Sequence, residues 1–280
     1  MKEYALNNGV KVPALAFGTW LIKDKDAPRC VKMALDAGYR HIDTAQAYGN
    51  ERGVGEGIRL SGLKREEVFI TSKVKAETKT YRGAKRSIDN SLKRLGVEYI
   101  DLMLIHCPQP WALFRSPIRF FKENINVWRA LEEAYKEGKL KAIGISNFFN
   151  DDTENILKNC EIKPMVNQIP VHICHTPLDV MRYSKEHDII VEAYSPIAHG
   201  RILNNKDIKA IADKYNVSVP QLCIQYTLQL NTISIPKASS KEHIEDNIKL
   251  DFEISKEDMI TLLKMNDSDY GEDPLWPLNN

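Results

Sequence analysis

The chain has 280 residues, of which 43% are hydrophobic and 28% charged. This composition can fill a sizeable core, which excludes a disordered, low-complexity or collagen-like chain, and no apolar run approaches the roughly 20 residues that cross a membrane. Lysines and arginines number 39 against 38 acidic residues, a net charge of +1, so we expect no nucleic-acid or membrane partner.

The first predicted element is a β-hairpin. Apolar residues 4–6 and 10–12 flank Asn7-Asn8-Gly9, and an Asn-Gly turn between apolar runs is a hairpin signal. We expect this hairpin to be a short plug that precedes the main body of the fold.

Strand and helix patterns then alternate along the rest of the chain. Amphipathic helices are predicted at residues 26–37, 83–95 and 127–137, and the last two are stopped by Gly96 and Gly138. Eight strand-and-helix repeats in a chain of this length predict the α/β class and a (β/α)8 TIM barrel. The eight predicted strands are residues 15–18, 41–43, 68–73, 100–105, 140–145, 165–169, 189–193 and 233–235.

An open doubly wound sheet is the alternative fold. Such a sheet needs G-x-G-x-x-G after its first strand, whereas this strand ends Phe17-Gly18-Thr19-Trp20. The nearest lookalike, Gly53-Val54-Gly55-Glu56-Gly57, has the wrong spacing and follows no strand. We interpret it as small residues that let a helix pack closely.

Cysteine usage and the first residues indicate the compartment. The five cysteines are widely spaced and form no C-x-x-C pair, which is typical of reduced thiols. The start, Met1-Lys2-Glu3-Tyr4-Ala5, is polar where a signal peptide needs an apolar run. We expect a cytoplasmic protein that folds as a single domain over residues 1–280. Balanced charge and the lack of an added oligomerisation segment favour a monomer.

Titratable residues of four types follow the predicted strands. The second strand ends at Asp43 and leads to Tyr48, while the third ends at Lys73 and the fourth leads to His106. Reactive groups of such barrels lie at the C-terminal strand ends, so these side chains should share one rim. Taken singly, each has a plain structural interpretation as a helix cap, a surface side chain or a core histidine.

Together, the four residues can donate a proton to a substrate oxygen. A phenol has an ordinary pKa near 10, and a nearby ammonium ion such as Lys73 is expected to lower the pKa of Tyr48. Asp43 would hold that lysine, and neutral His106 would orient the substrate oxygen. Because none of these groups moves a hydride, a cofactor must supply it.

The second half of the chain offers groups for that cofactor. Ser146-Asn147 and Gln168 carry hydroxyl and amide groups suited to a carboxamide, and Tyr194 could stack on a heterocycle. After the eighth strand, Lys237 and Ser239-Ser240 precede a helix and could bind phosphate, although the serines could equally be helix caps.

These motifs resemble the aldo-keto reductase family over essentially the whole chain. The residues that carry the resemblance are Gly18-Thr19-Trp20, Asp43-Thr44-Ala45, Tyr48-Gly49-Asn50-Glu51, Thr71-Ser72-Lys73, Asp101-Leu102 through His106, Gly144-Ile145-Ser146-Asn147-Phe148, Asn167-Gln168, Ala193-Tyr194-Ser195-Pro196 and Ile235-Pro236-Lys237. The resemblance implies reduction of aldehydes or ketones with NADPH and without metal. It also implies Tyr48 as proton donor, assisted by Lys73, Asp43 and His106.

The resemblance further implies the residues that contact cofactor and substrate. The expected cofactor-binding residues are Thr19, Trp20, Asp43, Ser146, Asn147, Gln168, Tyr194, Ser195, Pro196, Ile197, Lys237, Ala238, Ser239, Ser240, His243, Asp246 and Asn247. The expected substrate-binding residues are Trp20, Tyr48, His106 and Trp111, with Trp111 in an aromatic insertion at residues 107–123. The tail at residues 270–276 could reach over the pocket mouth.

The chain departs from the family pattern at three places. Ala238 stands where the family usually has Ser, and His243 where it has Arg. The loop at residues 197–204 does not match the usual cofactor-covering segment. A neutral imidazole binds phosphate less tightly than a guanidinium does. We therefore expect weaker discrimination between NADPH and NADH, so that NADH is used as well as NADPH.

Two other functions compete with reduction. A metal-dependent hydrolase could use His41, Asp43 and His106, together with His172, Cys174 and His175. The sequence holds no His-x-His pair, however, and this interpretation leaves Tyr48 and Lys73 without a role. A non-catalytic nicotinamide-nucleotide sensor could bind the cofactor in the same barrel and signal to a partner. The sequence does not name the carbonyl substrate.

Overall fold

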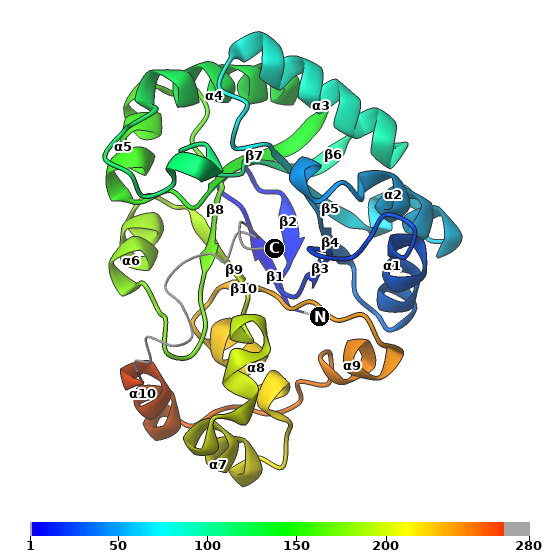
Figure 1. Ribbon diagram of the computed structural model, residues 1–280, viewed down its shortest axis with the longest axis vertical. Helices are drawn as coiled ribbons and strands as arrows, with labels where there is room; N and C mark the ends of the chain where they lie inside the picture. The colour runs from blue at the N-terminus through cyan, green and yellow to red at the C-terminus, as the bar shows by residue number, and fades with distance from the viewer. Residues whose placement is uncertain (1, 266–280) are drawn as a thin grey trace.

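A computed structural model describes residues 2–265 and shows a ring of eight parallel strands surrounded by helices (Figure 1). The strands pair in chain order from β3 to β10. They are β3 (Phe17–Gly18), β4 (His41–Asp43), β5 (Phe69–Val74), β6 (Ile100–Ile105), β7 (Leu140–Ser146), β8 (Val166–Pro170), β9 (Ile190–Tyr194) and β10 (Ile233–Ile235). Each predicted strand is present, with bounds shifted by at most two residues.

The first and last strands close the barrel. Leu15 forms a parallel bridge with Ser234, and the Ala16 amide donates to the Ser234 carbonyl at 2.8 Å. Two residues further on, the Gly18 amide donates to the Pro236 carbonyl at 2.9 Å. The predicted (β/α)8 barrel is therefore confirmed. Closure brings Trp20 and Lys237, which are far apart in the sequence, to the same rim.

The predicted N-terminal hairpin is also present. Strands β1 (Glu3–Ala5) and β2 (Lys11–Pro13) pair antiparallel, with Tyr4 opposite Val12. In Figure 1 the hairpin lies over the centre of the ring of strands. Val12 is fully buried in the main core, so the hairpin plugs one end of the barrel with apolar surface.

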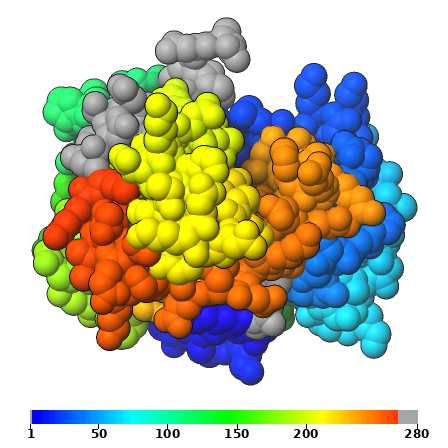
Figure 2. All heavy atoms as spheres, turned by 90° about the horizontal axis from the view of Figure 1, so that it is seen from below, coloured from blue at the N-terminus to red at the C-terminus, as the bar shows by residue number. Residues whose placement is uncertain are grey.

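The helices lie outside the strands. They are α1 (Ala27–Asp36), α2 (Glu51–Leu60), α3 (Tyr81–Leu95), α4 (Phe121–Lys136), α5 (Asn150–Asn159), α6 (Leu178–Glu186), α7 (Lys206–Lys214), α8 (Val219–Gln229), α9 (Lys241–Asp246) and α10 (Lys256–Lys264). Short 3-10 helices are η1 (Gln46–Tyr48), η2 (Arg65–Glu67), η3 (Trp111–Leu113) and η4 (Ala198–Asn204). Figure 2 shows the surface where α7 and α8, in yellow, stand between α9 and α10.

Helix bounds are less well predicted than strand bounds. Helix α4 begins at Phe121 rather than at residue 127, so the expected insertion at residues 107–123 ends inside a helix. Helix α3 ends as expected, with Gly96 as its C-cap at φ 68°.

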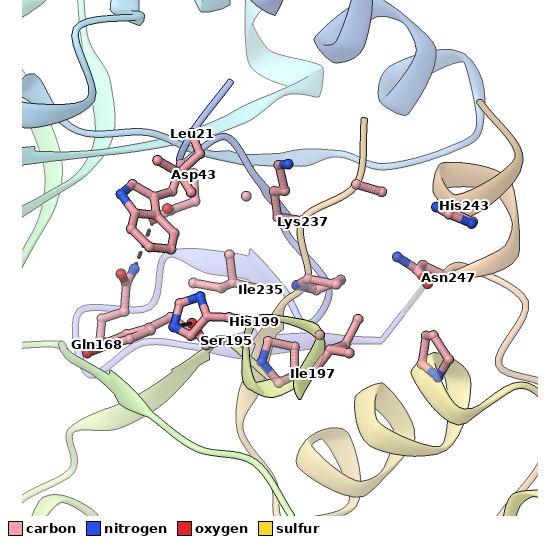
Figure 3. Close-up of a pocket in the computed structure, with 18 of the residues that line it drawn as sticks. Leu21, Asp43, Gln168, Ser195, Ile197, His199, Ile235, Lys237, His243 and Asn247 are labelled. Atoms are coloured by element: carbon pink, nitrogen blue, oxygen red, sulfur yellow. Dashed lines mark hydrogen bonds between the residues drawn. The ribbon is translucent and has the colours of Figure 1, made fainter. Parts of the chain in front are cut away.

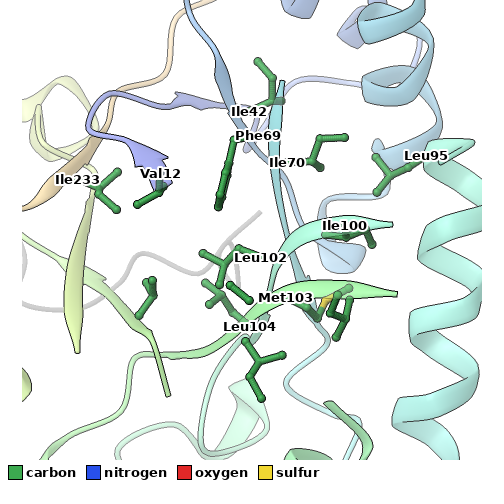
Figure 4. Close-up of a cluster of buried hydrophobic side chains, with 14 of the residues drawn as sticks. Val12, Ile42, Phe69, Ile70, Leu95, Ile100, Leu102, Met103, Leu104 and Ile233 are labelled. Carbon is green, nitrogen blue, oxygen red and sulfur yellow. The ribbon is translucent and has the colours of Figure 1, made fainter. Parts of the chain in front are cut away.

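Apolar side chains from the strands and the hairpin fill the barrel below the rim. Val12, Phe69, Leu102 and Ile233 belong to one buried cluster, which Figure 4 shows converging from the hairpin, β5, β6 and β10. A packed interior leaves the strand ends as the place where polar side chains can gather.

The glycines of α2 let that helix pack closely against its neighbours, as the sequence indicated. A Cβ atom built on Gly55 would lie 2.0 Å from the carbonyl oxygen of Leu95, and one on Gly53 would lie 2.2 Å from that of Asp24. Backbone atoms cannot move away as a flexible side chain can. No nucleotide-binding loop is formed here.

Replacing Gly55 with Ala should therefore destabilise the fold by about 3 kcal/mol, because overpacked cores typically lose this much. Urea unfolding would measure the loss. Glu56→Ala, at an exposed position of the same helix, is the matched control and should stay within about 0.5 kcal/mol of wild type. Equal stability of Gly55→Ala and wild type would contradict the close packing.

Candidate active site

A groove with a cavity volume of about 680 Å³ opens at the C-terminal ends of the strands. Of the residues expected at the site, seventeen line this groove. They are Trp20, Asp43, Tyr48, His106, Trp111, Ser146, Asn147, Gln168, Tyr194, Ser195, Pro196, Ile197, Lys237, Ala238, His243, Asp246 and Asn247. The four that do not line it are Thr19, Lys73, Ser239 and Ser240.

A buried ion pair lies at the floor of the groove. The Lys73 ammonium donates to both carboxylate oxygens of Asp43, at 2.8 and 2.7 Å, and to the Thr44 carbonyl at 2.9 Å. The Lys73 side chain is 0% exposed. Because β4 and β5 are adjacent parallel strands, Asp43 at the end of β4 and Lys73 near the end of β5 lie side by side.

Tyr48 lies directly above this ion pair. It ends the 3-10 helix η1, which follows β4, and its hydroxyl oxygen is 3.3 Å from the Lys73 nitrogen. The ammonium also lies 4.9 Å from the centre of the Tyr48 ring. The phenol and the ammonium are thus in contact, as the proton-donor interpretation requires.

The expected direction of the Tyr48 pKa shift is wrong. Burial of the phenol, together with the nearby Asp43 charge, raises the pKa of Tyr48 well above its ordinary value. Asp43 largely neutralises the ammonium on which the prediction relied. The phenol therefore keeps its proton across the physiological range, which still suits a donor to a far more basic alkoxide.

His106 follows β6 and packs edge-on against the rings of Tyr48 and Trp111, at centroid distances of 5.7 and 5.2 Å. Burial, with a smaller contribution from the Lys73 charge, lowers the pKa of His106 well below its ordinary value. The imidazole is therefore neutral at pH 7, as expected from the sequence. A neutral ring can orient an oxygen by hydrogen bonding without adding charge.

Hydroxyl and amide groups from β7, β8 and β9 form a network beside Tyr48. The Asn147 amide nitrogen donates to the His106 carbonyl at 3.0 Å and to Ser146 Oγ at 3.1 Å. The Tyr194 hydroxyl donates to Asn147 Oδ1 at 2.8 Å. Gln168 donates from Nε2 to Asp43 Oδ2 at 2.9 Å, which links this network to the ion pair.

The other end of the groove lies at β10 and α9. Lys237, Ala238, His243 and Asn247 line it, and Figure 3 shows the labelled Lys237, His243 and Asn247 around this end of the cavity. Ser240 caps α9 by accepting from the His243 amide at 3.3 Å, so it fills the capping role that the sequence left open.

Two other residues expected at the cofactor, Thr19 and Asp246, have hydrogen-bond partners within the protein. Thr19, expected at the cofactor, donates its hydroxyl to the Asp43 carbonyl at 2.9 Å. Asp246 accepts from Ser218 Oγ at 3.0 Å, and Ser239 is exposed.

The segment after β9 folds over the middle of the groove as η4. His199 packs edge-on against Trp20 at 5.0 Å, and its Nε2 lies 3.2 Å from Ser195 Oγ. His199 has a positive φ of 55°, a backbone conformation that residues other than Gly rarely adopt. His199 belongs to the loop at residues 197–204 that departs from the family pattern, and no sequence motif marks it as a groove residue.

Several groove residues were missed altogether. The cavity is also lined by Leu21, Leu203, Ser218, Pro220 and Glu242, which no motif marks. Ser218 and Pro220 are at the start of α8 and Glu242 is in α9, so their place at the groove depends on how these helices pack. The tail at residues 270–276, expected near the mouth, lies outside the described residues.

In the described part of the chain, no group of three or more His, Cys, Asp or Glu side chains is placed to hold a metal ion. Within residues 2–265, no helix is long and apolar enough to cross a membrane.

The fold and this site define a (β/α)8-barrel oxidoreductase, and comparisons with known proteins agree. The family model described as "Aldo/keto reductase family" matches residues 14–267. The chain is 41% identical to a glyoxal reductase of Bacillus subtilis, covering 96% of this chain and 95% of the relative. It is 39% identical to a 9,11-endoperoxide prostaglandin H2 reductase of Trypanosoma cruzi, covering 96% and 93%.

Solved structures agree with the sequence comparisons. An aldo/keto reductase from Brucella melitensis superposes with a TM-score of 0.87 at 36% identity, covering 94% of this chain and 98% of the other. An aldo-keto reductase of Bombyx mori in complex with NADP superposes with a TM-score of 0.85 at 30% identity, covering 99% of this chain and 98% of the other. The chain belongs to the aldo/keto reductase family, whose members use a nicotinamide cofactor.

The residues of this groove fit such a cofactor. The amide oxygen of Gln168 accepts no hydrogen bond from any described residue, although Gln168 lines the cavity beside Tyr48. The polar groups of the groove also suit this cofactor, because amide and hydroxyl side chains lie at one end of the groove and the Lys237 ammonium lies at the other. Gln168, Ser146 and Asn147 would hold the carboxamide, Tyr194 the ring, and Lys237 a phosphate.

Proposed function

We propose that this protein reduces aldehydes or ketones to alcohols, using NADPH and also NADH, with Tyr48 as the proton donor. The observation that carries the proposal is the contact of the Tyr48 hydroxyl with the buried Lys73–Asp43 pair at the floor of a groove lined by amides. A bound reduced nicotinamide supplies a hydride to the carbonyl carbon.

The protein's residues would perform the other parts of the reaction. His106 orients the carbonyl oxygen toward Tyr48 Oη, and Tyr48 gives its proton to that oxygen as negative charge develops on it. Lys73 lies 3.3 Å from Tyr48 Oη and stabilises the phenolate that remains. Trp20 and Trp111, which both line the groove, form an apolar wall for the substrate and help to exclude water.

The direct test is to measure NADPH and NADH oxidation against a panel of aldehydes, ketones and dicarbonyls. Glyoxal belongs in the panel because one relative is a glyoxal reductase. Turnover with at least one carbonyl, unchanged by a chelator, is the expected result. Cofactor binding without turnover on any member would favour the nucleotide sensor instead.

The proposed chemistry predicts different pH profiles for the two directions. Tyr48 has a raised pKa, so below that pKa the phenol holds its proton and stays competent to donate. Carbonyl reduction should therefore vary less than about threefold from pH 6 to pH 9. Alcohol oxidation needs the phenolate, whose fraction rises about tenfold per pH unit, so its rate should climb throughout. Steady-state kcat in both directions checks this, and a fall in reduction above pH 7 would contradict it.

Cofactor preference should be weak. His243 and Lys237 line the phosphate end of the groove, but so do the acidic side chains of Glu242 and Asp246. We expect kcat/KM for NADPH and NADH to be comparable, and a thousandfold preference for NADPH would defeat this expectation.

Replacing His243 with Arg should raise the preference for NADPH about tenfold, because a guanidinium holds a phosphate through paired, charge-assisted hydrogen bonds. The change should appear in the KM for NADPH, with the KM for NADH within about twofold of wild type. Lys241→Arg, which keeps its charge at an exposed position of α9 outside the groove lining, is the matched control.

A further inference from the structure

A buried carboxyl below the active site has no part in the mechanism described above. Glu192 lies on β9 with its side chain 0% exposed inside the barrel. Its Oε2 accepts a hydrogen bond from Gln168 Nε2 at 2.8 Å. The two residues stand directly opposite each other in the register of β8 and β9.

The same amide nitrogen of Gln168 also donates to Asp43 Oδ2 at 2.9 Å, the bond drawn in Figure 3. A primary amide has two hydrogens, so Asp43 and Glu192 together use both of them. Turning the amide over would place its oxygen against the Asp43 carboxylate, which is repulsive. The Asp43 carboxylate therefore fixes which way the Gln168 amide faces, and Glu192 holds the second amide hydrogen.

The amide oxygen of Gln168, to which no described residue donates, remains free to accept a hydrogen bond. Gln168 lines the groove, so a ligand in the groove can supply the donor. A ligand group that binds to this oxygen must present a hydrogen-bond donor. The NH2 of a nicotinamide carboxamide is such a group, whereas a methyl ketone is not.

We propose that Glu192 is a positioning residue for cofactor recognition, which through Gln168 sets the orientation of the nicotinamide carboxamide. This inference rests on the proposed function, since it assumes that a nicotinamide occupies the groove. Glu192 touches neither cofactor nor substrate in this scheme and acts only by holding the second hydrogen of the Gln168 amide.

The charges around Glu192 are compatible with this role. Burial and the nearby Asp43 raise the pKa of Glu192 to about 8, so the carboxyl is largely protonated at neutral pH and accepts through its carbonyl oxygen. Lys73 also faces Glu192, and its positive charge lowers the pKa of Glu192. His41 faces it as well, with Nε2 3.9 Å from Glu192 Oε1. Burial lowers the pKa of His41 to about 3, so this ring is neutral.

The test compares two substitutions in the full-length protein. Glu192→Leu has similar volume but no acceptor, whereas Glu192→Gln keeps a carbonyl oxygen for Gln168. Dissociation constants are measured by fluorescence titration for three probes: NADPH, its 3-acetylpyridine analogue, and 2′-phospho-ADP-ribose. The analogue replaces the carboxamide NH2 by a methyl group, and the third probe lacks the ring altogether.

Wild type should bind NADPH about tenfold more tightly than the acetylpyridine analogue, the value of roughly one hydrogen bond. Glu192→Leu should lose that discrimination while its affinity for 2′-phospho-ADP-ribose stays within twofold. Glu192→Gln should retain it. Full discrimination in Glu192→Leu, or its loss in Glu192→Gln, would overturn the proposal, and the second outcome is measurable even if the Leu variant does not fold.

Failure of the proposed function gives a different result. If wild type itself reduces no carbonyl and does not discriminate between NADPH and the analogue, then the proposed function is wrong. If wild type is active and discriminates but Glu192→Leu does so equally well, then only the role of Glu192 is wrong. A parallel loss of 2′-phospho-ADP-ribose affinity in Glu192→Leu would mark a general structural effect and would also overturn the proposal.

Discussion

Replacing Tyr48 with Phe should lower kcat for carbonyl reduction about a thousandfold, while the dissociation constant for NADPH stays within about twofold of wild type. The substitution removes one hydroxyl and leaves the ring in place against His106. Proton donation by a positioned side chain typically contributes between about 10²- and 10⁴-fold, so its loss should dominate the kinetics. Steady-state assays and fluorescence titration of the cofactor measure the two quantities.

Tyr39→Phe is the matched control. Tyr39 is a buried tyrosine that packs against Phe17 and does not line the groove, so its hydroxyl should not affect turnover. Unchanged activity in Tyr48→Phe would refute the proton-donor role. Equal loss of cofactor affinity and rate would show that Tyr48 is needed for binding instead, which a nucleotide sensor could also require.

The architecture could be predicted from sequence because it depends on local patterns. Predicted strands such as residues 100–105 and 189–193 are short, mainly apolar runs between helical segments, and the order of these elements determines a closed parallel barrel. Their C-terminal ends then share a rim, which places Asp43 and Lys73 together without any knowledge of the loops. Tyr48 lies further on, at the end of η1, so only its rim and not its exact position follows from the strand order.

The electrostatics could not be predicted in the same way. The sequence places Lys73 beside Tyr48, but the direction of the pKa shift depends on how deeply the phenol is buried and on how closely Asp43 neutralises the ammonium. Both are properties of the three-dimensional site. The bond between Gln168 and Glu192 was missed for a similar reason, since a carboxyl in an apolar strand carries no motif.

Lys73→Met should have the largest combined effect on stability and rate. The substitution leaves the Asp43 carboxylate 3% exposed and without its cation. Breaking a buried ion pair from one side typically costs about 3–5 kcal/mol, because an uncompensated charge stays buried. We expect the free energy of unfolding, measured by urea denaturation, to fall by this amount, and kcat to fall by about 10²-fold or more.

The double variant Lys73→Met/Asp43→Asn separates the two effects. Removing the stranded charge should restore most of the lost stability, because a neutral amide can still accept from Gln168 and costs far less to bury than a carboxylate. Activity should not return, because no cation would then stabilise the Tyr48 phenolate. Recovery of turnover along with stability would mean that Lys73 serves only to hold the fold. A double variant no more stable than Lys73→Met would mean instead that the ammonium's bond to the Thr44 carbonyl, rather than the charge of Asp43, holds the floor of the site.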